Sequence, residues 1–173
     1  GLALAGPILT GCADGVLQPM AQTGRLLCVV IDDSLSSRAT EPGGQMRFDQ
    51  LRRNALELID SLDSADRVAI WRCGRPAEPL LAPATLDHAA ARRHLERMTP
   101  RYSRADLPDA LNQVAIALAD PASNAREADT TFVVVLSDFA AGSLPRDRLS
   151  PPQALPEGTM FLAPRPAESL SNV

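Results

Sequence analysis

Two acidic residues, Asp32 and Asp138, stand where apolar runs of the sequence end. Asp32 directly follows the run 26–31, and Asp138 follows the run 131–136 after a single serine. In open α/β sheets, ligands bind beyond the carboxyl ends of the strands. If the two runs are neighbouring strands, both carboxylates converge on one crevice, where two like charges need a cation or a proton between them.

Serine hydroxyls at positions 34 and 36 add neutral oxygen atoms to the same turn. Alternate residues of an extended segment point the same way, so Asp32, Ser34 and Ser36 can face one ion. Oxygen ligands suit Mg²⁺ or Mn²⁺ rather than zinc or copper. An ion held by so few protein charges keeps water positions open, and it can accept a carboxylate from a partner without catalysis.

The composition fits one ordinary domain and excludes several kinds of chemistry. The chain has 173 residues, 45% of them apolar, and a net charge of −4. All 17 basic residues are arginine, which excludes a P-loop, a pyridoxal-phosphate Schiff base and a lysine general base. His88 and His94 are six residues apart, on different faces of a helix, so they do not form a metal pair. A slightly acidic chain with 3% aromatic residues is also a poor binder of nucleic acid.

The elements that must position these side chains follow from the apolar periodicity. Continuous runs at 26–31 and 131–136 are typical of strands buried on both faces of a parallel sheet. Strands alternating with amphipathic helices indicate an α/β fold with a parallel sheet. The other expected strands are 66–73, 78–81 and 159–162, and the expected helices are 46–62, one from Thr85 or Asp87 to Met98, and one from Asp106 onward.

Three cysteines, Cys12, Cys28 and Cys73, lack the spacing of a zinc or redox motif. Cys28 lies in an apolar run and is predicted to be a small buried hydrophobic residue. A Cys12–Cys73 or a Cys28–Cys73 disulfide remains open. Trp71, in an expected strand, is predicted to lie in the core.

The segment 30–36, Val-Ile-Asp-Asp-Ser-Leu-Ser, contains Asp-x-Ser-x-Ser at the end of an apolar strand. It resembles the first motif of the metal-ion-dependent adhesion site in von Willebrand factor type A (vWA) domains. An amphipathic helix, the Asp-Arg-Val-Ala-Ile strand, an Asp-Ala-Leu helix and Val-Val-Val-Leu-Ser-Asp-Phe follow in the family's order. The residues of this segment most resemble those of membrane-anchored bacterial aerotolerance (BatA-like) proteins, in which two N-terminal membrane helices precede the domain.

The resemblance covers residues 25–163 and implies a Rossmann-like three-layer fold. Its central sheet would be mostly parallel, with helices on both faces and without the family's last strand and helix. Residues 1–24 are expected to be the end of a membrane helix followed by an irregular linker, with 1–7 loosely packed. Residues 164–173 are expected to be a truncated C-terminal extension. By the family's membrane topology the domain would be extracytoplasmic.

Carried over residue by residue, Asp32, Ser34 and Ser36 match the first motif, and Asp138 matches the late aspartate. The family's middle ligand is a threonine, whose position here is Ala105. Ser103 and Asp106 are the candidate substitutes, although Asp106 also suits a helix cap. The resemblance implies a Mg²⁺ or Mn²⁺ ion and a protein partner that offers Asp or Glu.

Two other interpretations compete with this one. Asp32 and Asp138 can simply end strands and cap turns, which leaves a metal-free scaffold domain of a membrane protein. Asp32 also occupies the nucleophile position of haloacid-dehalogenase-like phosphatases, but these need a second acid where this chain has Ser34. Response-regulator receivers need a lysine, and no Gly-x-Ser-x-Gly motif is present. The chain is therefore predicted not to be an enzyme.

Overall fold

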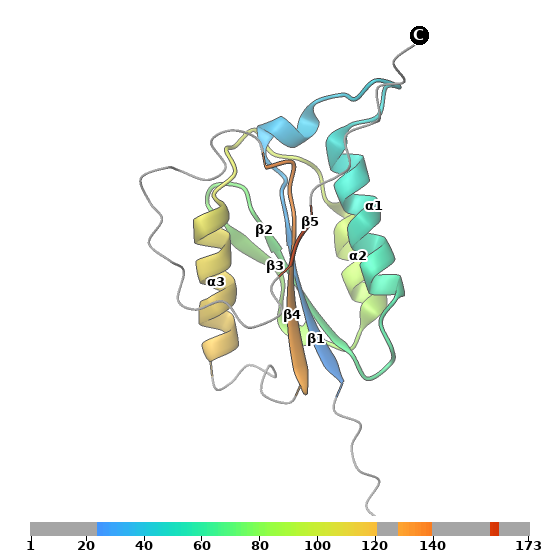
Figure 1. The fold of residues 1–173 in the computed structure, drawn as a ribbon, viewed down its shortest axis with the longest axis vertical. Helices are drawn as coiled ribbons and strands as arrows, with labels where there is room; N and C mark the ends of the chain where they lie inside the picture. The colour runs from blue at the N-terminus through green and yellow to red at the C-terminus, as the bar shows by residue number, and fades with distance from the viewer. Residues whose placement is uncertain (1–23, 121–127, 140–159, 163–173) are drawn as a thin grey trace, which may run out of the picture.

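The computed structural model describes residues 24–120, 128–139 and 160–162. Their strands form one five-stranded sheet in the order β3-β2-β1-β4-β5 (Figure 1). Strands β2 and β4 are parallel to β1, β5 is parallel to β4, and β3 is antiparallel to β2. The strands are β1 (Arg25–Ile31), β2 (Arg67–Arg72), β3 (Glu78–Thr85), β4 (Thr130–Leu136) and β5 (Met160–Leu162).

Helices cover both faces of this sheet, which confirms the predicted three-layer α/β fold. Helices α1 (Arg47–Asp60) and α2 (His88–Arg97) lie on one face, and α3 (Leu107–Ala119) lies on the other (Figure 1). A short 3-10 helix, η1 (Leu35–Arg38), follows β1. Helix α1 faces the core through one stripe at helical spacing, made of Phe48, Leu51, Ala55 and Ile59.

Two helices begin where the sequence predicts. Asp87 caps α2 by accepting a hydrogen bond from the backbone N–H of Ala90 at 2.8 Å. Asp106 caps α3 by accepting one from the N–H of Asp109 at 3.2 Å, and Pro108 lies in the first turn. Each carboxylate satisfies a donor that the helix itself leaves unpaired.

The strand register brings the predicted site residues to one edge of the sheet. Ile31 of β1 pairs with Leu136 of β4, so both strands end at the same level. The backbone N–H of Asp32 then donates to the carbonyl of Leu136 at 2.8 Å. Residues Cys28–Ile31 and Val133–Leu136 are fully or almost fully buried, as expected for central strands with a helix layer on each side.

Strand β3 differs from its prediction, which was a short strand at 78–81. It has eight residues and runs antiparallel to β2. The connection from β2 has only five residues, too few for the crossover that a parallel pair needs. Pro79 and Pro83 are compatible with β3 because it is an edge strand.

The cysteine and tryptophan predictions have mixed outcomes. Cys28 is completely buried and Trp71 is 3% exposed, so both belong to the core as predicted. Cys28 and Cys73 are free thiols, so the Cys28–Cys73 disulfide alternative is wrong. Cys12, residues 1–23 of the predicted leader 1–24, and the predicted extension 164–173 lie outside the described residues.

Candidate metal site at the carboxyl edge of the sheet

Three of the four predicted ligands are in direct contact. The hydroxyl oxygens of Ser34 and Ser36 are 3.1 Å apart. The Ser36 hydroxyl donates to Oδ1 of Asp138 at 3.3 Å, across 102 residues of sequence. The turn after β1 and the turn after β4 therefore place their side-chain oxygens together, as the sequence predicts.

The fourth predicted ligand, Asp32, is completely buried beside them. Its Oδ1 accepts a hydrogen bond from the backbone N–H of Ser34 at 2.9 Å. Its Oδ2 accepts one from the hydroxyl of Ser137 at 2.6 Å. Ser137 was not singled out as a site residue, although its place between β4 and Asp138 was a usable signal. These two bonds fix the Asp32 carboxylate at the junction of β1 and β4.

Arg47, the first residue of α1, supplies a positive charge to the site. Its Nη1 lies 3.3 Å from Oδ2 of Asp138, and its Nε donates to the carboxylate of Glu41. The bond to Glu41 and the bond to Asp138 both raise the pKa of the Arg47 guanidinium. Since Asp138 has a side chain that is only 4% exposed, this arginine is its internal counter-ion.

Ser103 and Asp106, the candidate substitutes for the missing threonine ligand, differ in whether their side chains already have hydrogen-bond partners. The backbone N–H of Leu35 donates to the carbonyl of Ser103 at 2.8 Å, which places Ser103 beside η1. The Ser103 hydroxyl is buried and has no hydrogen-bond partner in the described part of the chain. Asp106 is committed to the cap of α3 and lies 3.7 Å from Arg75. Ser103 is thus the candidate whose hydroxyl remains uncommitted.

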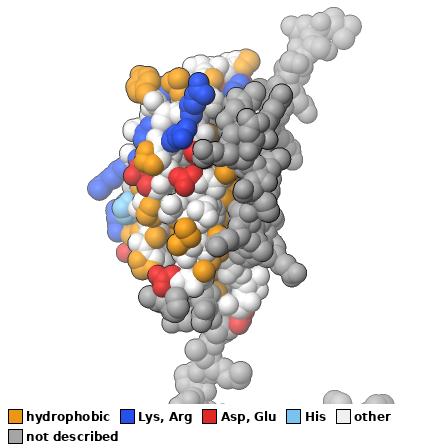
Figure 2. Space-filling view, turned by 90° about the vertical axis from the view of Figure 1, so that its left-hand side faces the viewer, with side chains coloured by type: hydrophobic (Ala, Val, Ile, Leu, Met, Phe, Trp, Pro, Cys, Tyr) orange, Lys and Arg blue, Asp and Glu red, His pale blue; other side chains and the backbone are white. Residues whose placement is uncertain are grey.

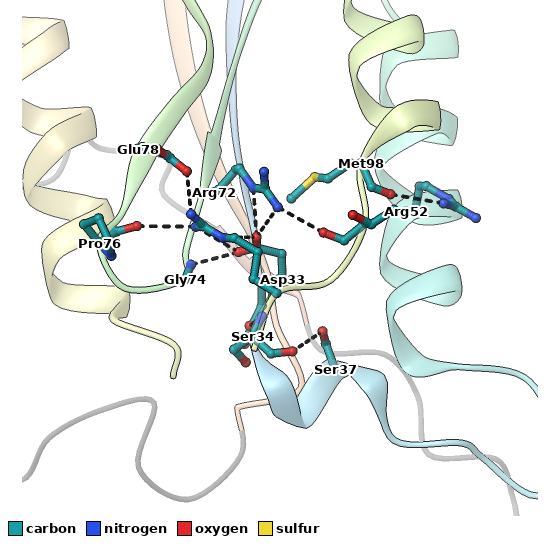
Figure 3. Close-up of polar contacts among 12 residues, drawn as sticks. Asp33, Ser34, Ser37, Arg52, Arg72, Gly74, Pro76, Glu78 and Met98 are labelled. Carbon is teal, nitrogen blue, oxygen red and sulfur yellow. Dashed lines mark hydrogen bonds and ion pairs between the residues drawn. The ribbon is translucent and has the colours of Figure 1, made fainter. Parts of the chain in front are cut away.

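Asp33, which the sequence analysis did not select, is the most heavily bonded carboxylate of this edge (Figure 3). It is 0% exposed. The backbone N–H of Gly74 donates to its Oδ1 at 2.9 Å. Oδ2 accepts from Nε of Arg72 at 2.8 Å and from Nε of Arg101 at 2.6 Å. We call these four residues the Asp33 clamp.

The Asp33 clamp joins three segments that are distant in sequence (Figure 3). The backbone N–H of Arg101 donates to the carbonyl of Asp33 at 2.6 Å. Arg101 also bonds Glu78 and the carbonyl of Pro76, while Arg72 reaches the carbonyl of Thr99 at 3.0 Å. The loop 99–106, which contains Ser103 and Ala105, is therefore positioned by an ion-pair cluster on the turn after β1.

Gly74 is required for this packing. A Cβ atom there would lie 2.7 Å from the Ser103 hydroxyl, 2.7 Å from Nη2 of Arg101 and 2.8 Å from Oδ1 of Asp33. These distances are well below van der Waals contact. The close approach of the three side chains thus depends on the absence of a side chain at position 74.

The donor set at this edge consists of carboxylate and hydroxyl oxygens, which is the chemistry that Mg²⁺ and Mn²⁺ prefer. Among the described residues, no group of three or more His, Cys, Asp and Glu side chains could hold a metal ion. The predicted site does not depend on such a group, because half of its ligands are serines. The side-chain oxygens of Ser34, Ser36 and Asp138 are therefore of the kind that suits a hard cation. The buried carboxylate of Asp32 lies beside them.

Comparison with known proteins establishes the family. The von Willebrand factor type A domain profile matches residues 27–141, about two thirds of the chain. The chain therefore belongs to the vWA domain family, as the Asp-x-Ser-x-Ser resemblance implied. No curated protein sequence matches the chain.

Solved structures with this fold include two from Bacteroides. BatB from Bacteroides thetaiotaomicron is 22% identical, with 66% of this chain and 54% of that chain covered and a TM-score of 0.55. An aerotolerance-related membrane protein from Bacteroides fragilis is 23% identical, with the same coverage and a TM-score of 0.56. The chain thus spans about half the length of these structures. The vWF domain of the pilus tip protein Mfa5 from Porphyromonas gingivalis is 16% identical, with 67% and 38% covered and a TM-score of 0.53.

No helix within the described ranges is both long and apolar enough to cross a membrane.

Proposed function

We propose that this vWA domain is a protein-interaction module. A Mg²⁺ or Mn²⁺ ion at the carboxyl edge of the sheet would join it to an acidic side chain of a partner protein. Ser34, Ser36 and Asp138 would hold the ion, and Asp32 would act through a bound water or a direct contact. The partner's carboxylate would complete the coordination shell.

One observation carries this proposal. The Ser36 hydroxyl lies 3.1 Å from the Ser34 hydroxyl and 3.3 Å from Oδ1 of Asp138, so it joins the turn after β1 to the turn after β4. The Asp138 carboxylate needs positive charge or hydrogen-bond donors around it, and a cation bound beside the two hydroxyls would supply charge that the hydroxyls do not. Arg47 provides part of that charge on the outer oxygen of Asp138, and Oδ1 faces Ser36.

The same geometry favours binding over catalysis. Asp32, the candidate nucleophile of a phosphatase, is 0% exposed, and each of its carboxylate oxygens already accepts a hydrogen bond. A nucleophile must approach its substrate to near contact. We therefore expect no phosphate release from a generic phosphate ester. Release that Asp32→Asn abolishes would favour a Mg²⁺-dependent phosphatase instead.

The test of the metal site is a calorimetric titration of the chain with Mg²⁺ and Mn²⁺. Weak binding is expected, because Ala105 replaces a hydroxyl ligand of the family. Asp138→Asn should abolish the binding heat, and Ala105→Thr should strengthen it. The control is Asp63→Asn, which should bind like wild type. Asp63 is an exposed carboxylate beside Arg25, the first residue of β1, so it lies at the opposite end of the strands. The proposal fails if neither wild type nor Ala105→Thr binds.

The second candidate is a metal-free scaffold domain. The Arg47–Asp138 ion pair favours it, because an internal guanidinium can satisfy Asp138 without any metal. In that case Asp138→Asn would lower thermal stability equally with and without Mg²⁺. In the metal-binding case, added Mg²⁺ stabilises wild type but not Asp138→Asn.

A membrane-anchored bacterial protein, with this domain on the extracytoplasmic side, is the setting that we propose. It is supported by the resemblance of the sequence to aerotolerance proteins and by the similar fold of an aerotolerance-related membrane protein from Bacteroides fragilis. Fractionation of tagged full-length protein and protease accessibility from the periplasmic side would test both parts.

A further inference from the structure

An exposed apolar and basic surface borders the candidate metal site. We call it the η1–102 rim and define it by Leu35, Arg38, Tyr102 and Arg104. Leu35 is 54% exposed and Tyr102 is 81% exposed. The guanidinium carbon of Arg38 lies 4.0 Å from the centre of the Tyr102 ring. The hydrogen bond from Leu35 to the carbonyl of Ser103 holds the two loops of the rim together.

The carboxylates of this edge are already committed to other groups. Asp33 pairs with Arg72 and Arg101, and Asp138 pairs with Arg47. In contrast, Arg38 and Arg104 have no carboxylate within ion-pair distance among the described residues. Within the described ranges, the rim therefore carries positive charge that no carboxylate pairs with, beside exposed apolar side chains. At the upper end of Figure 2, which is the η1 end of the molecule, blue and orange side chains lie next to each other.

We infer that the η1–102 rim binds an acidic polypeptide segment that carries an aromatic or aliphatic side chain next to its carboxylates. The apolar side chain would pack on Leu35 and the Tyr102 ring, and carboxylates would pair with Arg38 and Arg104. The inference deepens the proposed function, because it names the partner of the same edge. Its contacts do not require the metal ion.

The chemistry of the rim carries this choice of partner. Tyr and Arg are enriched among the side chains that dominate binding energy at protein interfaces. The cation above one face of Tyr102 also orders the ring before binding, which lowers the entropy lost on association. A nearby surplus of arginine favours carboxylates by charge complementarity and accelerates the encounter with them.

The experiment measures binding of two probes to the full chain, a random glutamate–tyrosine copolymer and polyglutamate of equal length. Each titration is run in EDTA and again with Mg²⁺. In EDTA, wild type should prefer the copolymer, and Tyr102→Ala should weaken copolymer binding about tenfold while affecting polyglutamate less. Arg38→Gln should weaken the binding of both probes.

Matched controls separate the rim from general effects. Leu86 is 48% exposed. It follows β3, which is antiparallel to β2, so it lies at the end of the sheet opposite the carboxyl ends of the parallel strands. Leu86→Ser should therefore bind like wild type. Arg53 is an exposed arginine of α1, and Arg53→Gln should also leave binding unchanged. Circular dichroism of all four variants checks that each is folded before its binding is compared.

The results overturn the inference if wild type does not distinguish the two probes, or if Leu86→Ser loses as much affinity as Tyr102→Ala. Binding that requires Mg²⁺ and is insensitive to Tyr102→Ala overturns the rim but supports the proposed metal function. Copolymer binding in EDTA, without any heat of metal binding in wild type or in Ala105→Thr, supports the rim and refutes the metal site. Self-association that Tyr102→Ala abolishes would assign the rim to a second copy of the chain and overturn the inference.

Discussion

Removal of the Asp33 carboxylate is the perturbation with the largest expected effect on stability. Asp33→Ala deletes acceptors for Gly74, Arg72 and Arg101 and leaves two guanidinium groups without their shared partner. Breaking one side of a buried ion pair costs about 3–5 kcal/mol. The side chains of Arg72 and Arg101 are 19% and 25% exposed, so water solvates them partly in the variant. We therefore expect a loss near the lower end, about 3 kcal/mol.

The assay is thermal and urea unfolding of the full chain, followed by circular dichroism. A loss of about 3 kcal/mol corresponds to a decrease in Tm of roughly 6–12 °C for a domain of this size. The control is Asp63→Ala, which removes a carboxylate that is 86% exposed and 3.2 Å from Arg25, and which should cost under about 1 kcal/mol. If Asp33→Ala is no more destabilising than Asp63→Ala, the Asp33 clamp does not organise this edge.

Three further predictions concern Gly74 of the same clamp, the carboxylate of Asp66 and the two buried thiols. Gly74→Ala should destabilise the domain by about 1–3 kcal/mol in the same unfolding assay, because its Cβ would overlap the Ser103 hydroxyl; unchanged stability would refute this packing. The side-chain hydrogen bond from Arg25 lowers the pKa of Asp66 to about 2. The stability advantage of wild type over Asp66→Asn should thus persist at neutral pH and disappear between about pH 4 and pH 2; a constant difference would contradict this linkage. Burial raises the pKa of the Cys28 thiol to about 12 and raises that of Cys73, so neither should react with Ellman's reagent until the protein unfolds; rapid labelling of either native thiol would contradict the described packing.

The elements that the sequence predicts correctly are those with strong local signals. The run 26–31 has no polar residue, so only a strand covered on both faces accommodates it. Asp87 and Asp106 each precede an apolar periodic segment, and each caps a helix in the structure. In these segments the burial pattern and the local hydrogen bonds point to the same structure.

Strand β3 shows where local signals are insufficient. Pro83 and weak alternation hide its second half, because an edge strand needs neither a full hydrogen-bond ladder nor two buried faces. Its direction depends on the length of the connection from β2, and not on its own residues.

The candidate site was predictable only where the motif names its residues. Asp32, Ser34, Ser36 and Asp138 have fixed places in the family pattern. The prediction that the first three alternate along one extended segment is wrong at Ser36, which lies in the 3-10 helix η1. The Ser36 hydroxyl nevertheless contacts Ser34 and Asp138. Asp33 falls between two of the motif positions, and its partners Arg72 and Arg101 are 39 and 68 residues away. A pairing of that kind becomes visible only when the register of β1 and β2 is known. The usable signal was a second aspartate directly after a buried strand, since a charge there needs a partner.

The alternation of this turn has a consequence for its dynamics. Asp32, Ser34 and Ser36 serve the candidate metal site, whereas Asp33 holds the loop 99–106 through Arg101. Because this attachment uses protein groups alone, we expect the loop to be ordered before any metal binds. Hydrogen exchange should give residues 99–106 the same protection with and without Mg²⁺, and Asp33→Ala should lower it at least tenfold. Strong additional protection on adding Mg²⁺ to wild type would show that the metal, and not the Asp33 clamp, orders the loop.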